Sequence, residues 1–261
     1  MSTLIIITGA SKGIGRSIAT AFAKDTRIAK LKLCLIARNL EGLKQTQQMV
    51  NSLSSSQRKI QTSIHSIDLS EIDTLHKSIE KLFKEEIQQD KFERTMLINN
   101  AGSLGYVGPS SDMPTPMEMT QAVNFNVTSA IWISSYFVKF FAHQHKTKCN
   151  VVNISSLCAI TPFKTMAMYC SGKAARDMWH KTLAAEEPSL RVLNYAPGAI
   201  ETDMTDILAN AKELDPELSA FYKRSKAKHT YIQPATTAKK LVNLIMEDKY
   251  ASGDHVDFWD E

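Results

Sequence analysis

The hydrophobic positions of this 261-residue chain fall into two kinds of segment that alternate along its length. Short runs rich in Val, Ile and Leu are followed by longer stretches whose apolar residues recur every three or four positions. The short runs predict strands buried on both faces of a parallel sheet, and the longer stretches predict amphipathic helices. Seven strands are expected, near residues 4–8, 31–37, 60–67, 95–100, 150–155, 191–196 and 254–258.

Helices are expected over residues 14–24, 40–53, 71–88, 118–143, 171–185 and 236–248. This alternation predicts one α/β domain over residues 1–261, a Rossmann-like doubly wound parallel sheet with helices on both faces. Ligands of such a sheet bind beyond the carboxyl ends of its strands. Two segments interrupt the alternation. Residues 103–117 are rich in Gly and Pro and predict a loop, and residues 199–232 contain polar helical pieces that we expect to form a substrate lid.

The composition narrows the class of protein. Hydrophobic residues make up 43% and charged residues 22%, as in ordinary soluble globular domains. The net charge is +4 and the basic residues are scattered, so no nucleic-acid partner is expected. The most apolar stretch, 122–142, contains Asn124, Asn126 and Lys139, and therefore predicts a buried helix rather than a membrane span.

The cysteines and the N-terminus suggest a compartment. The spacing of the cysteines is not that of a metal site, so we expect reduced thiols and no bound metal. The first expected strand begins almost at Met1, which leaves no room for a signal peptide. A cytoplasmic protein is the simplest interpretation. The cysteines are Cys34, Cys149, Cys158 and Cys170.

A glycine-rich turn, Thr8-Gly9-Ala10-Ser11-Lys12-Gly13-Ile14-Gly15, joins the first expected strand to the first helix. Glycines at such a turn let backbone N–H groups approach a pyrophosphate, and the positive end of the helix dipole favours an anion there. The turn therefore predicts a dinucleotide site. The alternative is a tight strand-to-helix turn that binds no ligand. The expected cofactor contacts are Gly9, Ser11, Lys12, Gly13, Ile14 and Gly15.

The residues after the second expected strand favour the phosphorylated cofactor. NAD-specific enzymes place a carboxylate there to hold the ribose 2′-OH, whereas this strand is followed by Arg38 and Asn39. A guanidinium can pair with a 2′-phosphate, so NADPH/NADP+ is expected, with Lys12 and Arg16 adding positive charge. A solvated surface arginine is the alternative. Further along the pocket we expect contacts from Asp68, Leu69, Asn100, Ala101 and Gly102.

A Tyr-x-x-x-Lys pair provides the candidate catalytic chemistry. Tyr169 and Lys173 lie four residues apart at the start of an expected helix, which places them on one face. Tyr222 and Lys226 have the same spacing within a polar segment. Only the first pair follows a strand that ends in serine, with Ser156 thirteen residues before Tyr169. Ser156, Tyr169 and Lys173 are therefore the expected catalytic set.

These side chains suit the reduction of a carbonyl, which needs a hydride at carbon and a proton at oxygen. A tyrosine with a pKa of about 10 is a weak acid at neutral pH, so we expect the Lys173 ammonium to lower the pKa of Tyr169. Ser156 would donate a hydrogen bond to the substrate oxygen as negative charge develops. Asn126 would hold a water that resupplies protons through Lys173, its alternative role being a cap or a buried bridge.

Taken together, the glycine turn, Asn-Asn-Ala-Gly, Ser156, Tyr-x-x-x-Lys and Pro197-Gly198 resemble the short-chain dehydrogenase/reductases. Residues 153–159, 169–178, 191–198 and 252–260 further resemble the members of that family that reduce pterins. The resemblance implies a cytosolic homodimer that uses NADPH to reduce side-chain keto groups of pterins such as sepiapterin or 6-pyruvoyl-tetrahydropterin, at the end of tetrahydrobiopterin synthesis. It also implies cofactor contacts from Tyr169, Lys173, Pro197, Gly198, Thr202 and Met204.

The same resemblance implies a substrate anchor, because the aspartate that matches Asp257 holds the 2-amino-4-oxo edge of the pterin. That edge has two adjacent N–H donors, and one carboxylate can accept both. A solvated residue after the last strand is the alternative. The expected substrate contacts are Ser156, Leu157, Cys158, Tyr169, Gly198, Met204 and Asp257, with Phe221 from the lid.

Two other functions remain open. A reductase of ketones and quinones of broad specificity would use the same side chains, with pterins incidental. A nucleotide-binding regulator would sense NADPH without turnover. The presence of Ser156, Tyr169 and Lys173 together argues against the regulator, because a protein that only binds does not need all three.

Overall fold

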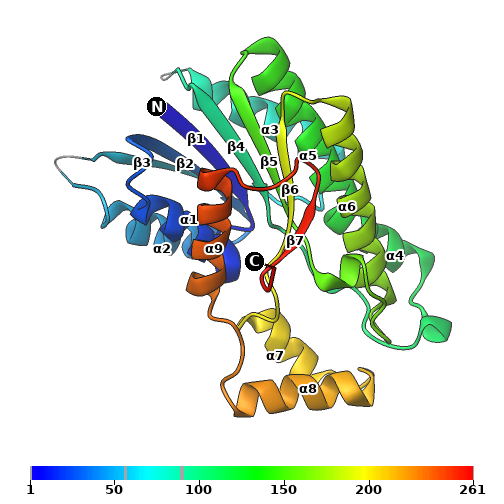
Figure 1. Ribbon diagram of the computed structural model, residues 1–261. Helices are drawn as coiled ribbons and strands as arrows, with labels where there is room; N and C mark the ends of the chain where they lie inside the picture. Colours follow the sequence, from blue (N-terminus) through cyan, green and yellow to red (C-terminus); the bar gives the residue numbers. More distant parts are fainter. Residues whose placement is uncertain (1, 56–57, 89–90, 261) are drawn as a thin grey trace.

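A single parallel sheet forms the centre of the molecule (Figure 1). The computed structural model describes residues 2–55, 58–88 and 91–260. Within them, seven strands lie in the order β3-β2-β1-β4-β5-β6-β7, so the predicted fold class is confirmed. The chain order reverses between β1 and β4, where doubly wound sheets bind ligands. The strands are β1 (Ser2–Thr8), β2 (Lys30–Ala37), β3 (Ile60–Ser66), β4 (Arg94–Asn99), β5 (Lys148–Ile154), β6 (Arg191–Ala196) and β7 (His255–Asp257).

Helices cover both faces of the sheet, which explains the nearly continuous hydrophobic strands. Ile5 and Ile7 of β1 pack in the core under α1 (Gly13–Lys24), α2 (Leu40–Asn51) and α9 (Pro234–Glu247). Leu4 and Ile6 face the opposite core, under α3 (Ile72–Ile87) and α5 (Ser129–Phe137). Adjacent side chains of one strand therefore stabilise two separate cores.

The long helix expected over 118–143 differs from the prediction in two respects. Its first segment, α4 (Pro116–Val123), begins inside the predicted loop 103–117, because Thr115 and Glu118 form a capping box at its N-terminus. Wide π-helical turns at Asn124–Thr128 and Val138–Gln144 flank α5. Such turns are frequent at functional sites, and Asn126 lies in the first one.

The segment expected to form a lid leaves the sheet and returns to it at one place. An isolated parallel bridge pairs Ile200 with Ile232, near the two ends of the predicted range 199–232. Between them lie α7 (Asp203–Asn210) and α8 (Pro216–Ala227), which Figure 1 shows below the carboxyl ends of the strands. Across the described ranges, no helix combines the length and hydropathy that a membrane span requires.

Candidate active site

The glycine turn has the geometry expected of a phosphate-binding loop. Gly9 and Gly13 have φ of +68° and +55°, a region that favours glycine. A Cβ on Gly15 would lie 2.3 Å from the Gly9 carbonyl oxygen, so the turn is packed tightly against its own helix. α1 begins without a side-chain cap and without an acidic residue in its first turn. Its N-terminal N–H groups are thus suited to an anion, and the turn fits a dinucleotide phosphate.

The positive side chains near this turn have different roles. Arg38 is exposed at the end of β2, and its Nη1 lies 3.5 Å from an Asp68 carboxylate oxygen. Lys12 is also exposed and forms an ion pair with Asp203 of α7. Arg16, expected to add charge for a phosphate, instead donates hydrogen bonds to the Ser11 carbonyl and, at 3.0 Å, to Thr46 Oγ1. Arg16 therefore holds the turn against α2 through neutral acceptors, and its contribution of positive charge to a phosphate site stays a prediction.

The four predicted catalytic residues come together at the carboxyl end of β5. Ser156 follows β5, and Tyr169 and Lys173 lie in the first two turns of α6 (Ala167–Glu186). α6 begins four residues before the expected 171, so Tyr169 is itself helical. Lys173 Nζ lies 5.5 Å from the centre of the Tyr169 ring. Asn126, Tyr169, Gly172, Lys173 and Arg176 line one small pocket, so distant parts of the chain share a site.

The Tyr222 and Lys226 pair with the same spacing belongs to α8 of the lid segment, where Tyr222 packs in the same apolar cluster as Cys158 and Tyr169. The Tyr222 carbonyl accepts a hydrogen bond from Tyr231, and Lys226 forms an ion pair with Asp206, both within the lid segment. The Tyr-x-x-x-Lys spacing alone therefore does not identify the catalytic pair. The serine at the end of the preceding strand, Ser156, distinguishes the two pairs.

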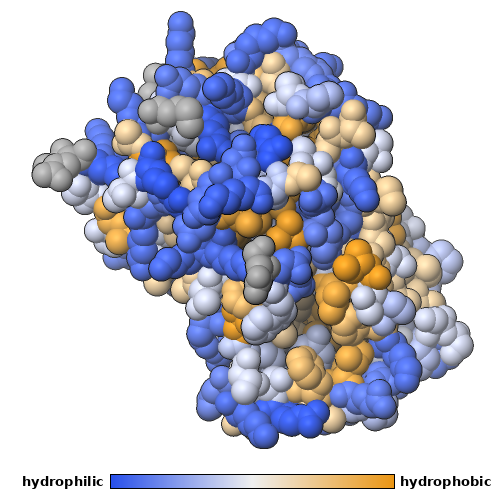
Figure 2. Space-filling model, viewed as in Figure 1, coloured by the Kyte–Doolittle hydropathy of each residue, from blue (hydrophilic) through white to orange (hydrophobic). Residues whose placement is uncertain are grey.

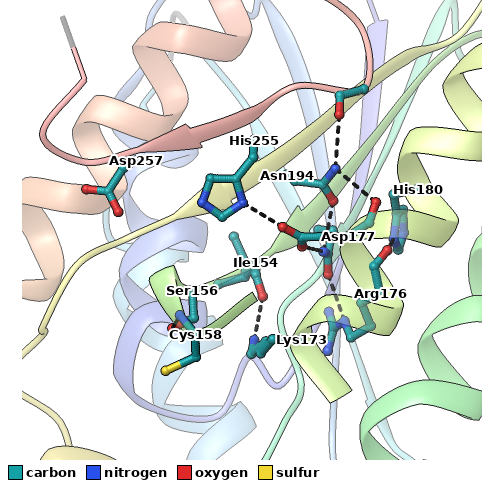
Figure 3. Close-up of polar contacts among 12 residues, drawn as sticks. Ile154, Ser156, Cys158, Lys173, Arg176, Asp177, His180, Asn194, His255 and Asp257 are labelled. Carbon is teal, nitrogen blue, oxygen red and sulfur yellow. Dashed lines mark hydrogen bonds and ion pairs between the residues drawn. The ribbon is translucent and has the colours of Figure 1, made fainter. Parts of the chain in front are cut away.

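Burial controls the charges of the catalytic pair. It raises the pKa of Tyr169, while the Ser156 hydroxyl and the Arg176 charge act in the opposite direction. Burial lowers the pKa of Lys173 to about 7, and Arg176 adds to this effect. Lys173 Nζ donates a 2.6 Å hydrogen bond to the Ile154 carbonyl (Figure 3). The expectation that Lys173 lowers the pKa of Tyr169 is therefore wrong for this structure, because Lys173 is itself desolvated.

Asn126 bridges two segments of the chain. Its Oδ1 accepts a 2.7 Å hydrogen bond from the Ser103 backbone N–H, and its Nδ2 lies 3.3 Å from Ser103 Oγ. The π-helical turn is thus fastened to the loop that follows the Asn-Asn-Ala-Gly segment. This is the bridging role that the sequence left open, and the water-holding role stays a prediction.

The candidate pterin anchor is at the end of the last strand. Asp257 pairs in register with Ala196, directly before Pro197-Gly198. Its Oδ1 accepts a 3.0 Å hydrogen bond from the Trp259 N–H, and Figure 3 shows it apart from the Ser156 and Lys173 side chains. Trp259 itself is 74% exposed. Trp259 is therefore a surface side chain.

Apolar side chains line the space under the lid. Cys158 packs in a cluster with Tyr169 and Met204, together with apolar side chains of α7 and α8. Burial raises the pKa of the Cys158 thiol to about 12, so it is a neutral wall residue. Leu157 and Phe221 are 45% and 42% exposed, and Figure 2 shows orange and tan side chains where the lid meets the body. All four cysteines are free.

A buried charged network behind the catalytic residues was not anticipated. Arg176 is only 1% exposed, and Asp177 beside it receives hydrogen bonds from Asn153 Nδ2 at 2.8 Å and contacts His255 Nδ1 at 2.6 Å (Figure 3). The sequence contained a signal for it, because Arg176 follows Lys173 by three positions and therefore shares its buried helix face.

Comparisons with known proteins agree with this geometry. A model of the short chain dehydrogenase family matches residues 3–213, and the chain belongs to that family. Membership confirms the expected class, an oxidoreductase with a nicotinamide cofactor. Over 260 residues the chain is 37% identical to the sepiapterin reductase of Xenopus tropicalis, covering 99% of this chain and 97% of that protein.

Two further similarities are to a benzil reductase and to a solved structure of the same fold. The chain is 29% identical over 216 residues to a benzil reductase ((S)-benzoin forming) of Bacillus subtilis, covering 81% of this chain and 80% of that one. The crystal structure of the KRED1-Pglu enzyme matches with a TM-score of 0.79 at 20% identity, covering 98% of this chain and all of that one, and supports the fold.

Proposed function

We propose that this chain is an NADPH-dependent reductase of side-chain ketones on pterins, with sepiapterin as a substrate. The observation that carries the proposal is the meeting of Ser156, Tyr169 and Lys173 at the carboxyl end of the sheet, the same end at which the glycine turn follows β1. The full-length similarity to a sepiapterin reductase supports the choice of a pterin.

The cofactor would supply the hydride, and the residues around it would fix its position. In this proposal the glycine turn holds the pyrophosphate, and Arg38 pairs with the 2′-phosphate. Asp68 and Leu69 face the adenine end, and Asn100 to Gly102 form the inner wall. Asn100 Nδ2 donates to the carbonyls of Thr8 and Gly9 at 2.9 and 3.2 Å, which keeps that wall against the turn.

The proton would come from Tyr169. Ser156 stabilises the negative charge that develops on the substrate oxygen, and the phenol gives up its proton to that oxygen. Because burial holds the pKa of Tyr169 high, the phenol is fully protonated before the reaction and acts as an acid. Lys173, with a pKa of about 7, can then pass a proton to the phenolate at neutral pH.

The substrate would lie between the lid and the end of β7. Asp257 would accept the paired N–H donors of the pterin, and Leu157, Cys158 and Met204 would contact its apolar faces. Gly198 has φ of +76°, and a Cβ there would lie 2.4 Å from Ile232 Cδ1, so this position is closely packed and suits glycine. A cytosolic homodimer belongs to this proposal, and light scattering that gives only the monomer mass would contradict the dimer.

The direct test is a substrate panel with NADPH and NADH. Sepiapterin should drive NADPH oxidation, and Tyr169→Phe should lower kcat about 10³-fold because the general acid is lost. Tyr222→Phe, the matched change at the second Tyr-x-x-x-Lys pair, should retain most of the activity. No oxidation of NADPH with any carbonyl substrate would refute the proposed function.

The pterin assignment has its own test at the anchor. Asp257→Ala should raise KM for sepiapterin about 10-fold to 100-fold, the loss expected for a charge-assisted hydrogen-bond pair, and spare small diketones. Equal losses on both substrates would remove Asp257 from this role. Reduction of diketones is the second candidate function, favoured by the similarity to a benzil reductase. A higher kcat/KM for benzil than for sepiapterin would establish it.

A further inference from the structure

Arg176, a buried arginine that forms no ion pair with any carboxylate of the described residues, lies directly behind the catalytic pair. The guanidinium of Arg176 donates to Asn153 Oδ1 at 2.7 Å, to the Ala101 carbonyl at 2.9 Å and to the Asn99 carbonyl at 2.5 Å. All three acceptors are neutral. The carboxylate of the adjacent Asp177 is connected to the Arg176 guanidinium through Asn153, whose Nδ2 donates to Asp177 Oδ1.

These contacts join the two halves of the candidate site. Asn99 and Ala101 begin the wall expected to face the cofactor, at the carboxyl end of β4. Arg176 is in the same helix as Tyr169 and Lys173, so one side chain fixes the distance from that wall to the proton donors. Arginine suits this task because its planar guanidinium spreads five N–H donors over three nitrogens and can reach three separated acceptors, whereas the three donors of an ammonium all lie on one nitrogen.

The unpaired charge has a second consequence. A cation buried in a medium of low dielectric acts on its neighbours far more strongly than one in water. Arg176 disfavours the Lys173 ammonium and favours the Tyr169 phenolate, whereas Asp177 favours the Lys173 ammonium. Other titratable groups near the pair are Cys158 in the 157–159 turn, Cys170 and His180 in α6, Tyr222 in α8 and His255 in β7, the last held by Asp177.

We propose that Arg176 is a positioning residue with two effects: its fork fixes the Asn99–Gly102 wall relative to Tyr169 and Lys173, and its charge sets the proton affinity of that pair. The proposal rests on the function proposed above, but its main test does not depend on turnover.

The test follows Lys173 directly, by the ¹³Cε signal of labelled lysine, assigned with Lys173→Met. In Arg176→Gln the Lys173 titration midpoint should rise by about one pH unit or more, because a nearby cation is removed. In Asp177→Asn it should fall, because an anion is removed. Lys181→Met, on the exposed part of the same helix, should leave it unchanged. General loosening of the site cannot produce shifts of opposite sign.

The positioning effect is separated by Arg176→Lys, which keeps the charge and loses the fork. Its Lys173 midpoint should stay near the wild-type value, while its Kd for NADPH, measured by nicotinamide fluorescence, should rise about 10-fold. An unchanged Kd in Arg176→Lys, or a midpoint that does not rise in Arg176→Gln, would overturn the proposal. If Arg176→Gln does not fold, the proposal would be overturned by a Lys173 midpoint that fails to fall in Asp177→Asn. Normal titrations without any ketone reduction would refute only the proposed function.

Discussion

Among single residues, Arg38 is the one on which cofactor choice depends. Its ion pair with Asp68 is 3.5 Å long and exposed, and such surface pairs contribute only about 0–1 kcal/mol. Breaking the Arg38–Asp68 ion pair to form one between Arg38 and a phosphate therefore costs little free energy. Arg38→Gln should raise KM for NADPH about 10-fold to 100-fold and leave KM for NADH nearly unchanged.

Arg27 provides a matched control for that experiment, because it is also a surface arginine, paired with Asp25. Arg27→Gln should leave both KM values unchanged. An equal rise of KM for NADPH and for NADH in Arg38→Gln would show that Arg38 stabilises the site in general and does not bind the 2′-phosphate specifically.

The residues that sequence analysis identified are those whose relation is local. Tyr169, Lys173 and Ser156 lie within one strand, turn and helix, so their spacing was enough. Arg176 was missed because a charged residue in an amphipathic helix is normally assigned to the solvent face, and one of its acceptors, Asn99, lies 77 positions away. The pKa of Tyr169 was misjudged for a similar reason, since burial depends on tertiary packing.

Among the elements, the glycine turn offers two positions, Gly13 and Gly15, at which the same substitution to alanine should have different effects. A Cβ on Gly15 would clash with the Gly9 carbonyl, whereas a Cβ on Gly13 would meet, among the described residues beyond its chain neighbours and its own helix, only the Thr202 side chain at 3.7 Å. Gly13→Ala should therefore cost only the left-handed backbone strain, about 1–2 kcal/mol. Gly15→Ala should cost more and should also abolish NADPH binding, because the whole turn must move.

Thermal unfolding and NADPH fluorescence would measure both variants. Equal effects of the two substitutions would contradict the view that the turn is packed against its own helix.

The strands and most of the helices could be predicted from the hydrophobic pattern alone, since burial of both sheet faces leaves continuous apolar runs. The π-helical turn at Asn124–Thr128 could not be predicted in this way, because no periodic pattern marks one inserted residue. In addition, Asn126 is hydrogen-bonded to Ser103, which belongs to another segment of the chain.

At the scale of the whole molecule, a buried histidine connects the sheet to two helices. His180 is fully buried, with Nδ1 2.8 Å from the Arg176 carbonyl and Nε2 3.0 Å from Ser134 Oγ of α5. Asn99 of β4 donates in turn to Ser134. The Arg176 carbonyl can only accept, so Nδ1 carries a proton. Burial disfavours the imidazolium, so the folded chain requires a neutral imidazole, whose Nε2 accepts from Ser134.

This requirement makes stability depend on pH. Burial lowers the pKa of His180 to about 4, against 6.5 for an ordinary histidine. Below pH 6.5 the unfolded chain binds a proton that the folded chain refuses, so stability is lost as the pH falls from 6.5 towards 4. Between pH 7 and pH 5 the wild type should lose about 1–2 kcal/mol through this group. Urea unfolding of wild type and His180→Gln at both pH values measures it. The variant should be less stable at pH 7 but should lose less on acidification, and an equal loss in both proteins would mean that His180 is not the group that titrates.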